Sequence, residues 1–265
     1  MHSNKQSFRC AAVMAGALLL GACAMPPQVS PEELQARQAH LAKVQKAKAR
    51  FEELCKTAGI TVNRRVTGVK GIRLEKVPAE SGWKDWMDPM WPEAALSGGA
   101  DGGALLELLL KNRSIEPETG KLTGNVKVRN ENSVPGFEYL DVRQPDGTWR
   151  RYSIGLLEGG RVSVNSRPIG ESALAPYLLS YELLVDRSAR ELWIAGAEIK
   201  VTDVDGGGTL GVVRKYVWDR GMGDAAGGRS PWIMASGNAI CPNLDGHAAW
   251  GHFLVSIEKI ISPED

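Results

Sequence analysis

The chain has 265 residues, of which 43% are hydrophobic and 24% charged, and its 32 basic and 31 acidic side chains give a net charge of +1. This composition is ordinary for a globular protein. A nucleic-acid-binding protein would carry a basic excess, so no nucleic acid is expected as a partner.

The first apolar run, Ala11–Ala22, predicts a secretory leader. It is twelve residues long, whereas a helix that spans a bilayer needs about 20. Lys5 and Arg9 precede it without any acidic residue, as in the basic region of a signal peptide. No later apolar run is long enough to cross a membrane. We therefore expect residues 1–22 to be a signal peptide, with no membrane span after it.

The segment Leu20-Gly21-Ala22-Cys23 resembles the lipobox of bacterial lipoproteins, in which the cysteine is acylated and becomes the new N-terminus. The resemblance implies a lipid on Cys23 and a lipidated tether over residues 23–30. The residue after the cysteine is Ala24 and not aspartate. By resemblance to Gram-negative lipoproteins, this favours the outer membrane over the inner one. The alternative is an ordinary cleaved signal in which Cys23 occurs by chance.

A capping box predicts a long helix over residues 31–58. Ser30 stands at the N-cap position, Pro31 at the first helical position and Glu33 three residues after the serine. Gly59 can take the left-handed conformation that ends a helix. One apolar face favours docking of the C-terminal half on the rest of the protein. Its members are Val44, Ala47, Phe51, Leu54, Cys55 and Ala58.

The rest of this helix is expected to face solvent. Leu34 and Leu41 lie to one side of the apolar face, which predicts an exposed N-terminal half. Lys43, Lys46 and Arg50 fall on the opposite face. They are compatible with contact to anionic lipid headgroups, but a solvated face is favoured because the helix also carries acidic residues and the cluster is small.

The remaining chain predicts short strands joined by tight turns. Pro145-Asp146-Gly147 and Asp205-Gly206-Gly207-Gly208 are turn sequences between strand-like runs, and short turns connect antiparallel strands. We therefore predict one α+β domain over residues 31–265, with the long N-terminal helix packed on a largely antiparallel β-sheet. Its further elements are strands within 60–77 and 175–185, a short helix over 103–111 and one helical turn within 186–192.

The chain lacks the sequence motifs of the large hydrolase, metalloprotease and nucleotide-binding families, such as G-x-S-x-G, H-E-x-x-H and the Walker loop. Asp245, His247 and His252 stand close together, and aspartate and histidine are metal ligands. Histidines five residues apart share neither a helix face nor a strand face, however, so we favour a structural role for them. No metal and no cofactor are expected.

Tryptophans and one glycine-rich segment supply the candidate binding residues. Trp83, Trp86 and Trp91 lie in an irregular segment. If exposed, they could stack on a sugar or a partner, but tryptophan is highly buried on average, which favours burial of at least two. Arg229 and Trp232 lie in GMGDAAGGRSPWIMASGNAICP, which is either a binding loop or a packed crossover. The candidates are Trp83, Trp86, Arg229 and Trp232.

Three stretches resemble blocks of an uncharacterised family of proteobacterial lipoproteins. They are ARFEELCKTAGITVNRRVTGVKGI, RSARELWIAGAEIKVTDV and GGRSPWIMASGNAICP, and the resemblance extends in scattered blocks over most of the chain. It implies an envelope location and a cysteine after the first helix matched by one near the C-terminus. It implies no activity and no catalytic residue.

The four cysteines divide into two groups. Cys10 would leave with the leader and Cys23 would carry lipid, which leaves Cys55 and Cys241. The periplasm is oxidising, and two cysteines allow only one pairing. We predict a Cys55–Cys241 disulfide; the alternative is two free, buried cysteines that never meet.

These features favour a cell-envelope lipoprotein that acts as a non-enzymatic binding or accessory module. It would be lipid-anchored at the periplasmic face of the outer membrane, with another envelope protein or the cell wall as its partner. The alternative is an envelope hydrolase with an unrecognised active site, for which Asp245, His247 and His252 are the candidate residues.

Overall fold

The computed structural model describes residues 30–96, 102–115, 118, 122–126, 133–156, 162–184, 186–244 and 255–263. The chain divides into two compact units, Met1–Ala39 and His40–Asp265. The boundary falls inside helix α1 (Pro31–Cys55), and all other described elements belong to the second unit. The fold is α+β, as predicted.

Helix α1 begins with the expected capping box. The Ser30 hydroxyl accepts a hydrogen bond from the Glu33 amide (3.1 Å), and the Glu33 carboxylate accepts one from the Ser30 amide (2.8 Å). The predicted end of the helix was wrong by three residues. The backbone after Cys55 tightens into hydrogen bonds between residues three apart. Gly59 does not cap the helix, because it is the first residue of strand β1 (Gly59–Val62) and pairs with Arg214.

The main sheet has nine strands and is largely antiparallel, as predicted. Its order is β1-β11-β10-β9-β2-β6-β7-β8, with β12 also beside β11. Among its described strand pairings, those of β2 with β6 and with β9 are parallel and the others antiparallel. The bounds are β2 Gly71–Leu74, β6 Tyr139–Arg143, β7 Trp149–Leu156, β8 Val162–Ile169, β9 Tyr177–Leu184, β10 Ile194–Asp203, β11 Gly208–Trp218 and β12 Ile240–Cys241.

A long crossover joins β2 to β6, because parallel neighbours cannot be joined by a tight turn. It contains three helical segments and a small antiparallel sheet of order β4-β3-β5. The segments are α2 (Trp83–Trp86), η1 (Pro92–Ala95), α3 (Gly102–Leu110), β3 (Asn112–Ile115), β4 (Leu122–Val126) and β5 (Ser133–Val134). Three further short segments are η3 (Glu171–Ala173), α4 (Arg187–Arg190) and η4 (Ala226–Gly228), and helix α5 spans Pro231–Asn238.

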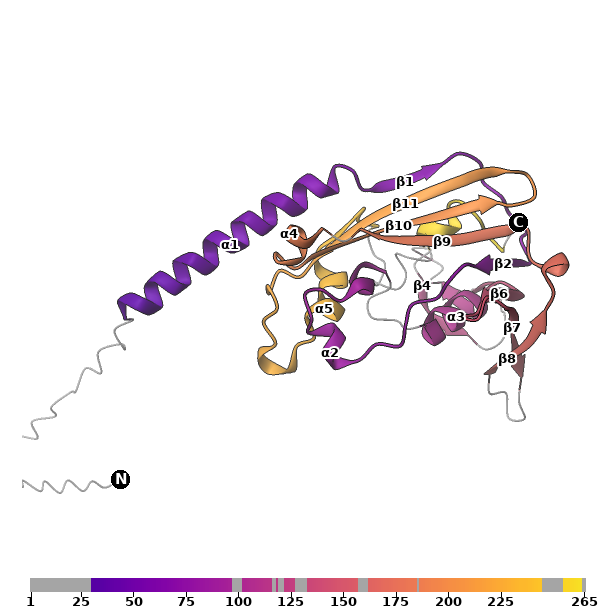
Figure 1. Cartoon of the computed structure of the whole chain (residues 1–265), viewed down its shortest axis with the longest axis horizontal. Coiled ribbons are helices and arrows are strands. Elements are labelled where there is room, and N and C mark those ends of the chain that lie inside the picture. Colours follow the sequence, from indigo (N-terminus) through magenta and orange to yellow (C-terminus); the bar gives the residue numbers. More distant parts are fainter. Residues whose placement is uncertain are drawn as a thin grey trace, which may run out of the picture. The chain divides into compact units, whose positions relative to one another are not determined.

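The main hydrophobic core lies on the face of the sheet covered by α2, α3 and α5 (Figure 1). Helix α3 is apolar on nearly all sides, with Leu105, Leu106 and Leu108–Leu110 all buried, as expected of a helix enclosed by other elements. The sheet contributes alternate residues, such as Ala195 and Ala197 of β10, because successive strand side chains point to opposite faces.

A second, smaller cluster lies on the opposite face of the sheet and holds α1. Ile194 and Trp218 point to this face from the ends of β10 and β11, and Ala47 of α1 is fully buried against the cluster. Phe51 packs its ring 5.8 Å from that of Trp218. Residues 44–55 are therefore the docked half of α1, as the apolar face predicted. By contrast Leu41 remains 52% exposed.

The predicted disulfide is present. Cys55, the last residue of α1, bonds to Cys241 of β12, and the two Cα atoms are 5.6 Å apart. Cys241 pairs with Tyr216 of β11. The bond thus fastens the end of the docked half of α1 to the sheet on which that helix packs.

Candidate functional site

Two hollows lie along the docked half of α1. The first, here called the cleft, encloses about 370 Å³ and lies where Leu54 of α1 faces the sheet. The second, here called the groove, encloses about 800 Å³ beside residues 42–50. Both volumes fall within the range of about 300–1,000 Å³ that is usual for small-molecule sites.

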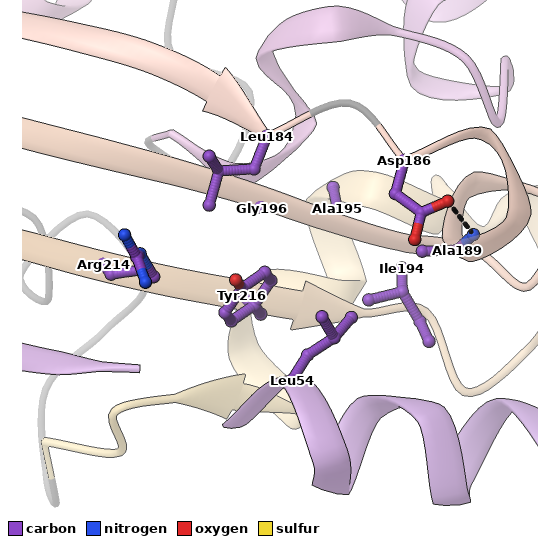
Figure 2. Close-up of a pocket in the computed structure, with 9 residues that line it drawn as sticks. All are labelled: Leu54, Leu184, Asp186, Ala189, Ile194, Ala195, Gly196, Arg214 and Tyr216. Carbon is purple, nitrogen blue, oxygen red and sulfur yellow. Dashed lines mark hydrogen bonds between the residues drawn. The ribbon is translucent and has the colours of Figure 1, made fainter. Parts of the chain in front are cut away.

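The wall of the cleft is mostly apolar. Figure 2 shows Leu54 of α1, Leu184 of β9 and Ile194 of β10 around it, with Tyr216 of β11 at its centre. Gly196 of β10 is the residue paired with Tyr216 on the neighbouring strand. A Cβ atom at this position would come within 2.6 Å of the Tyr216 ring, so glycine is what lets the ring lie flat across β10.

The polar side chains of the cleft are already engaged within the protein. Asp186 caps α4 by accepting hydrogen bonds from the backbone and hydroxyl of Ser188 (2.9 and 2.7 Å), and it accepts a third from Arg50 (2.8 Å). Ser188 and then Arg50 lower the pKa of Asp186 to about 2. A carboxylate with such a low pKa is a weak base at neutral pH.

The other two polar groups of the cleft are paired in the same way. Arg214 donates to the carboxylate of Glu198 on the neighbouring strand (2.9 Å), and the Tyr216 hydroxyl lies 3.3 Å from that of Thr57. Among the described residues that line the cleft there is no histidine, cysteine or serine. The cleft therefore offers shape and apolar surface, without a nucleophile beside a general base.

The groove combines a basic wall with an apolar one. Helix α1 contributes Lys43, Lys46 and Arg50, and the apolar lining is provided by Pro89, Met90, Leu192 and Trp193, together with Ala42. The sequence-based placement of the three basic residues was wrong: they lie on the flank of the helix beside its docked face. Arg50 in particular is only partly exposed, because it is paired with Asp186.

Trp193 gives the groove a fixed wall in an uncommon backbone conformation. Its φ is +56°, and left-handed conformations of bulky residues cost on the order of 1–3 kcal/mol. Two backbone hydrogen bonds hold it there: its amide donates to Arg190 (2.8 Å), and its carbonyl accepts from Asp219 (2.9 Å). Its ring also packs on that of Trp232, with centroids 5.2 Å apart.

The structure corrects two of the four candidate binding residues. Trp232 is fully buried, and its indole N–H donates to the carbonyl of Asp88 (2.7 Å). Arg229 bonds through its guanidinium to Asp219, whose side chain is fully buried, and to the carbonyl of Asp224 (2.7 Å). The glycine-rich segment is thus a packed crossover, and both residues hold it in place.

The other two candidates remain partly accessible. Trp83 is 49% exposed on α2, whereas Trp86 is half-buried and donates its indole N–H to Ser81 (3.2 Å). Trp91 is buried in the main core. None of these three lines the cleft or the groove.

Several predicted residues lie outside the described part of the chain: Cys23, Asp245, His247 and His252. Within the described ranges, no group of three or more histidine, cysteine or acidic side chains could hold a metal ion. The helices in those ranges also include none that is both long enough and apolar enough to cross a membrane.

Sequence reasoning did not find the apolar lining of the groove. Its residues come from the segment before η1 and from the turn between α4 and β10, about 100 positions apart in the chain. No local pattern links them. The lysines at 43 and 46 were visible as a basic cluster, but their location beside an apolar wall was not.

No family model, no curated protein and no solved structure matches the chain. The function must therefore be argued from the geometry of the described sites and from the N-terminal motif.

Proposed function

We propose that the chain is a cell-envelope lipoprotein that acts as a non-enzymatic binding or accessory module. Acylated Cys23 would hold it at the periplasmic face of the outer membrane, and its partner would be another envelope protein or the cell wall. The lipobox-like segment supports the anchor. The Cys55–Cys241 disulfide supports an oxidising compartment, since structural disulfides are rare in reducing ones.

One observation carries the choice of binding over catalysis. The cleft is a hollow in the surface whose charged side chains, Asp186 and Arg214, both form ion pairs or hydrogen bonds within the protein. A general base near neutral pH needs a pKa close to that pH, and Asp186 has a pKa of about 2. Such a cleft suits an apolar side chain or small ligand that enters without proton transfer.

One experiment in cells tests both parts of the proposal. A photoreactive phenylalanine analogue replaces Leu184 in the cleft, or Asp146 in the exposed turn between β6 and β7 as the control. Each of these two replacements is made both in the wild-type chain and in the Cys23→Ser variant. Membranes are then fractionated and crosslinked products identified by mass spectrometry.

We expect the chain with Cys23 to sediment with membranes and the Cys23→Ser variant to be released. The reason is that the lipid on Cys23 would be the stable attachment of the protein to the membrane. We expect the probe at position 184, but not at position 146, to capture a defined envelope component. Unchanged sedimentation of Cys23→Ser would refute the anchor. Identical products from both probe positions would refute the cleft as a binding site.

A further inference from the structure

We propose that the groove binds an anionic phospholipid, with its phosphate headgroup at Lys43 and Lys46 and the start of its acyl chains against Met90 and Trp193. The proposal goes beyond the partner-binding role of the cleft. It rests on the proposed function only in that an envelope membrane would be the source of the lipid.

The groove carries positive charge that is not paired within the described residues. Lys43 and Lys46 form no ion pair within the described residues, and they lie three residues apart on the same side of α1, where side chains are neighbours. Arg50 is the third cation, but it is paired with Asp186. Glu191 is the one carboxylate among the described lining residues, and it lies 3.5 Å from Arg187. Two lysine charges are therefore left for a ligand.

A buried arginine adds to this charge from behind the groove. Arg190 is fully buried, and its two terminal nitrogens donate to the carbonyls of Trp91 and Pro92 (2.9 Å each). Its Nε has no partner among the described residues. Burial lowers the pKa of Arg190 to about 10, so it stays protonated at neutral pH.

The charge of Arg190 acts close to the groove lining. Its guanidinium lies 5.6 Å from the centre of the Trp232 ring, and Trp232 packs against Trp193 of the groove. Asp88 and Glu93 are near enough to raise the pKa of Arg190, yet neither forms a hydrogen bond with it. These two carboxylates offset part of the Arg190 charge, so Lys43 and Lys46 remain the main positive charges for an anion in the groove.

An apolar wall lies beside these charges. Pro89, Met90, Leu192 and Trp193 line the same hollow as the lysines. Methionine adapts its shape to irregular ligands, and Trp193 is held rigidly by its neighbours. A ligand that satisfies both walls must carry negative charge and apolar chain in one molecule. A polyanion without chains would leave the apolar wall uncovered, and a flat bilayer surface cannot enter a concave groove.

The test uses the full chain purified in a neutral maltoside detergent and titrated with dioctanoyl phosphatidylglycerol, with native mass spectrometry as the readout. The groove variant is Lys43→Gln/Lys46→Gln. The control is Lys48→Gln/Lys56→Gln, which removes the same charge from two exposed positions outside the groove, one within α1 and one just after it. Met90→Gln changes the apolar wall without changing the charge.

We expect the groove variant to lose affinity by about tenfold or more, since each lysine near an anionic lipid contributes about 1 kcal/mol. The control should stay within about twofold of wild type. Met90→Gln should also weaken binding, and dioctanoyl phosphatidylcholine and octanoate should bind more weakly than phosphatidylglycerol.

Three results would overturn the proposal. One is equal loss in the groove and control variants, and another is equal affinity for phosphatidylglycerol and phosphatidylcholine. The third is binding of a deca-glutamate peptide at least as tight as that of the lipid, which would make the groove a site for acidic protein segments. Because the titration needs neither the Cys23 anchor nor the cleft, its failure would leave the proposed function standing.

Discussion

Asp219 and Arg229 show which of the two interpretations of the glycine-rich segment is correct, the packed crossover and not the binding loop. Arginine and tryptophan between glycines indicate a binding loop only while their partners are unknown. Here the partner of Arg229 is ten residues earlier in the chain, and the indole of Trp232 bonds to Asp88, 144 residues away. The sequence around each residue carries no sign of these contacts, since they form only when the fold is complete.

Lys215 is a residue for which burial has a measurable consequence. Its side chain is 3% exposed on β11, and its ammonium donates to the carbonyl of Leu96 (2.6 Å). Burial lowers its pKa from 10.5 to about 8. The unfolded chain therefore binds a proton more tightly than the folded one, which costs about 3 kcal/mol of stability below pH 8. This cost disappears as pH rises to about 10.5.

We expect Lys215→Met to raise the free energy of unfolding at pH 7 by about 1–3 kcal/mol, because it removes the buried charge and keeps the volume. The advantage over wild type should shrink steadily between pH 8 and pH 10, where folded wild type has lost the Lys215 proton and the unfolded chain still holds it. Urea unfolding at a series of pH values measures this difference in the free energy of unfolding. Lys200→Met, on the exposed side of β10, is the control and should show no such trend. A constant advantage of Lys215→Met from pH 7 to pH 10 would contradict the explanation.

At the scale of elements, the features that depend on neighbouring residues in the chain were predicted correctly. The turns at Asp146-Gly147 and Asp205–Gly208 join antiparallel strands as expected, with Gly147 and Gly207 in left-handed conformations (φ +86° and +71°). The capping box and the docked face of α1 were also predicted. The parallel placement of β2 was not predicted, because β2 pairs with β6 and β9, which lie far along the chain. The small β3–β5 sheet was not predicted either, although its strands are close in the sequence.

The two halves of α1 allow a test of docking within one helix. Phe51 is half-buried against Trp218, whereas Leu41 is 52% exposed. We expect Phe51→Ala to lower the free energy of unfolding by about 2 kcal/mol, below the usual cost of fully buried phenylalanines. Leu41→Ala should change it by less than about 0.5 kcal/mol. Equal effects of the two changes in chemical denaturation would show that the helix is not held by its second half.

At the scale of the whole molecule, the disulfide joins parts that the sequence separates widely. It links residues 186 positions apart, and the loop that it closes contains β1, β2 and β6 to β11 of the main sheet and the whole small sheet. The pairing could be predicted because only two cysteines remain once the lipobox resemblance is accepted. What the sequence did not show is that Cys241 sits in β12 beside β11, so the bond joins α1 to the sheet at the second cluster.

The disulfide is tested in the full chain with Cys10→Ser and Cys23→Ser, which leaves Cys55 and Cys241 as its only cysteines. Under denaturing conditions we expect no titratable thiol before reduction and two after it. In that background, changing Cys55 and Cys241 to serine should lower the free energy of unfolding by about 2–5 kcal/mol. The chain-entropy relation sets the upper value, and a compact unfolded state reduces it. Two thiols before reduction would refute the bond. Unchanged stability of the serine variant would show instead that the second cluster alone holds α1 to the sheet.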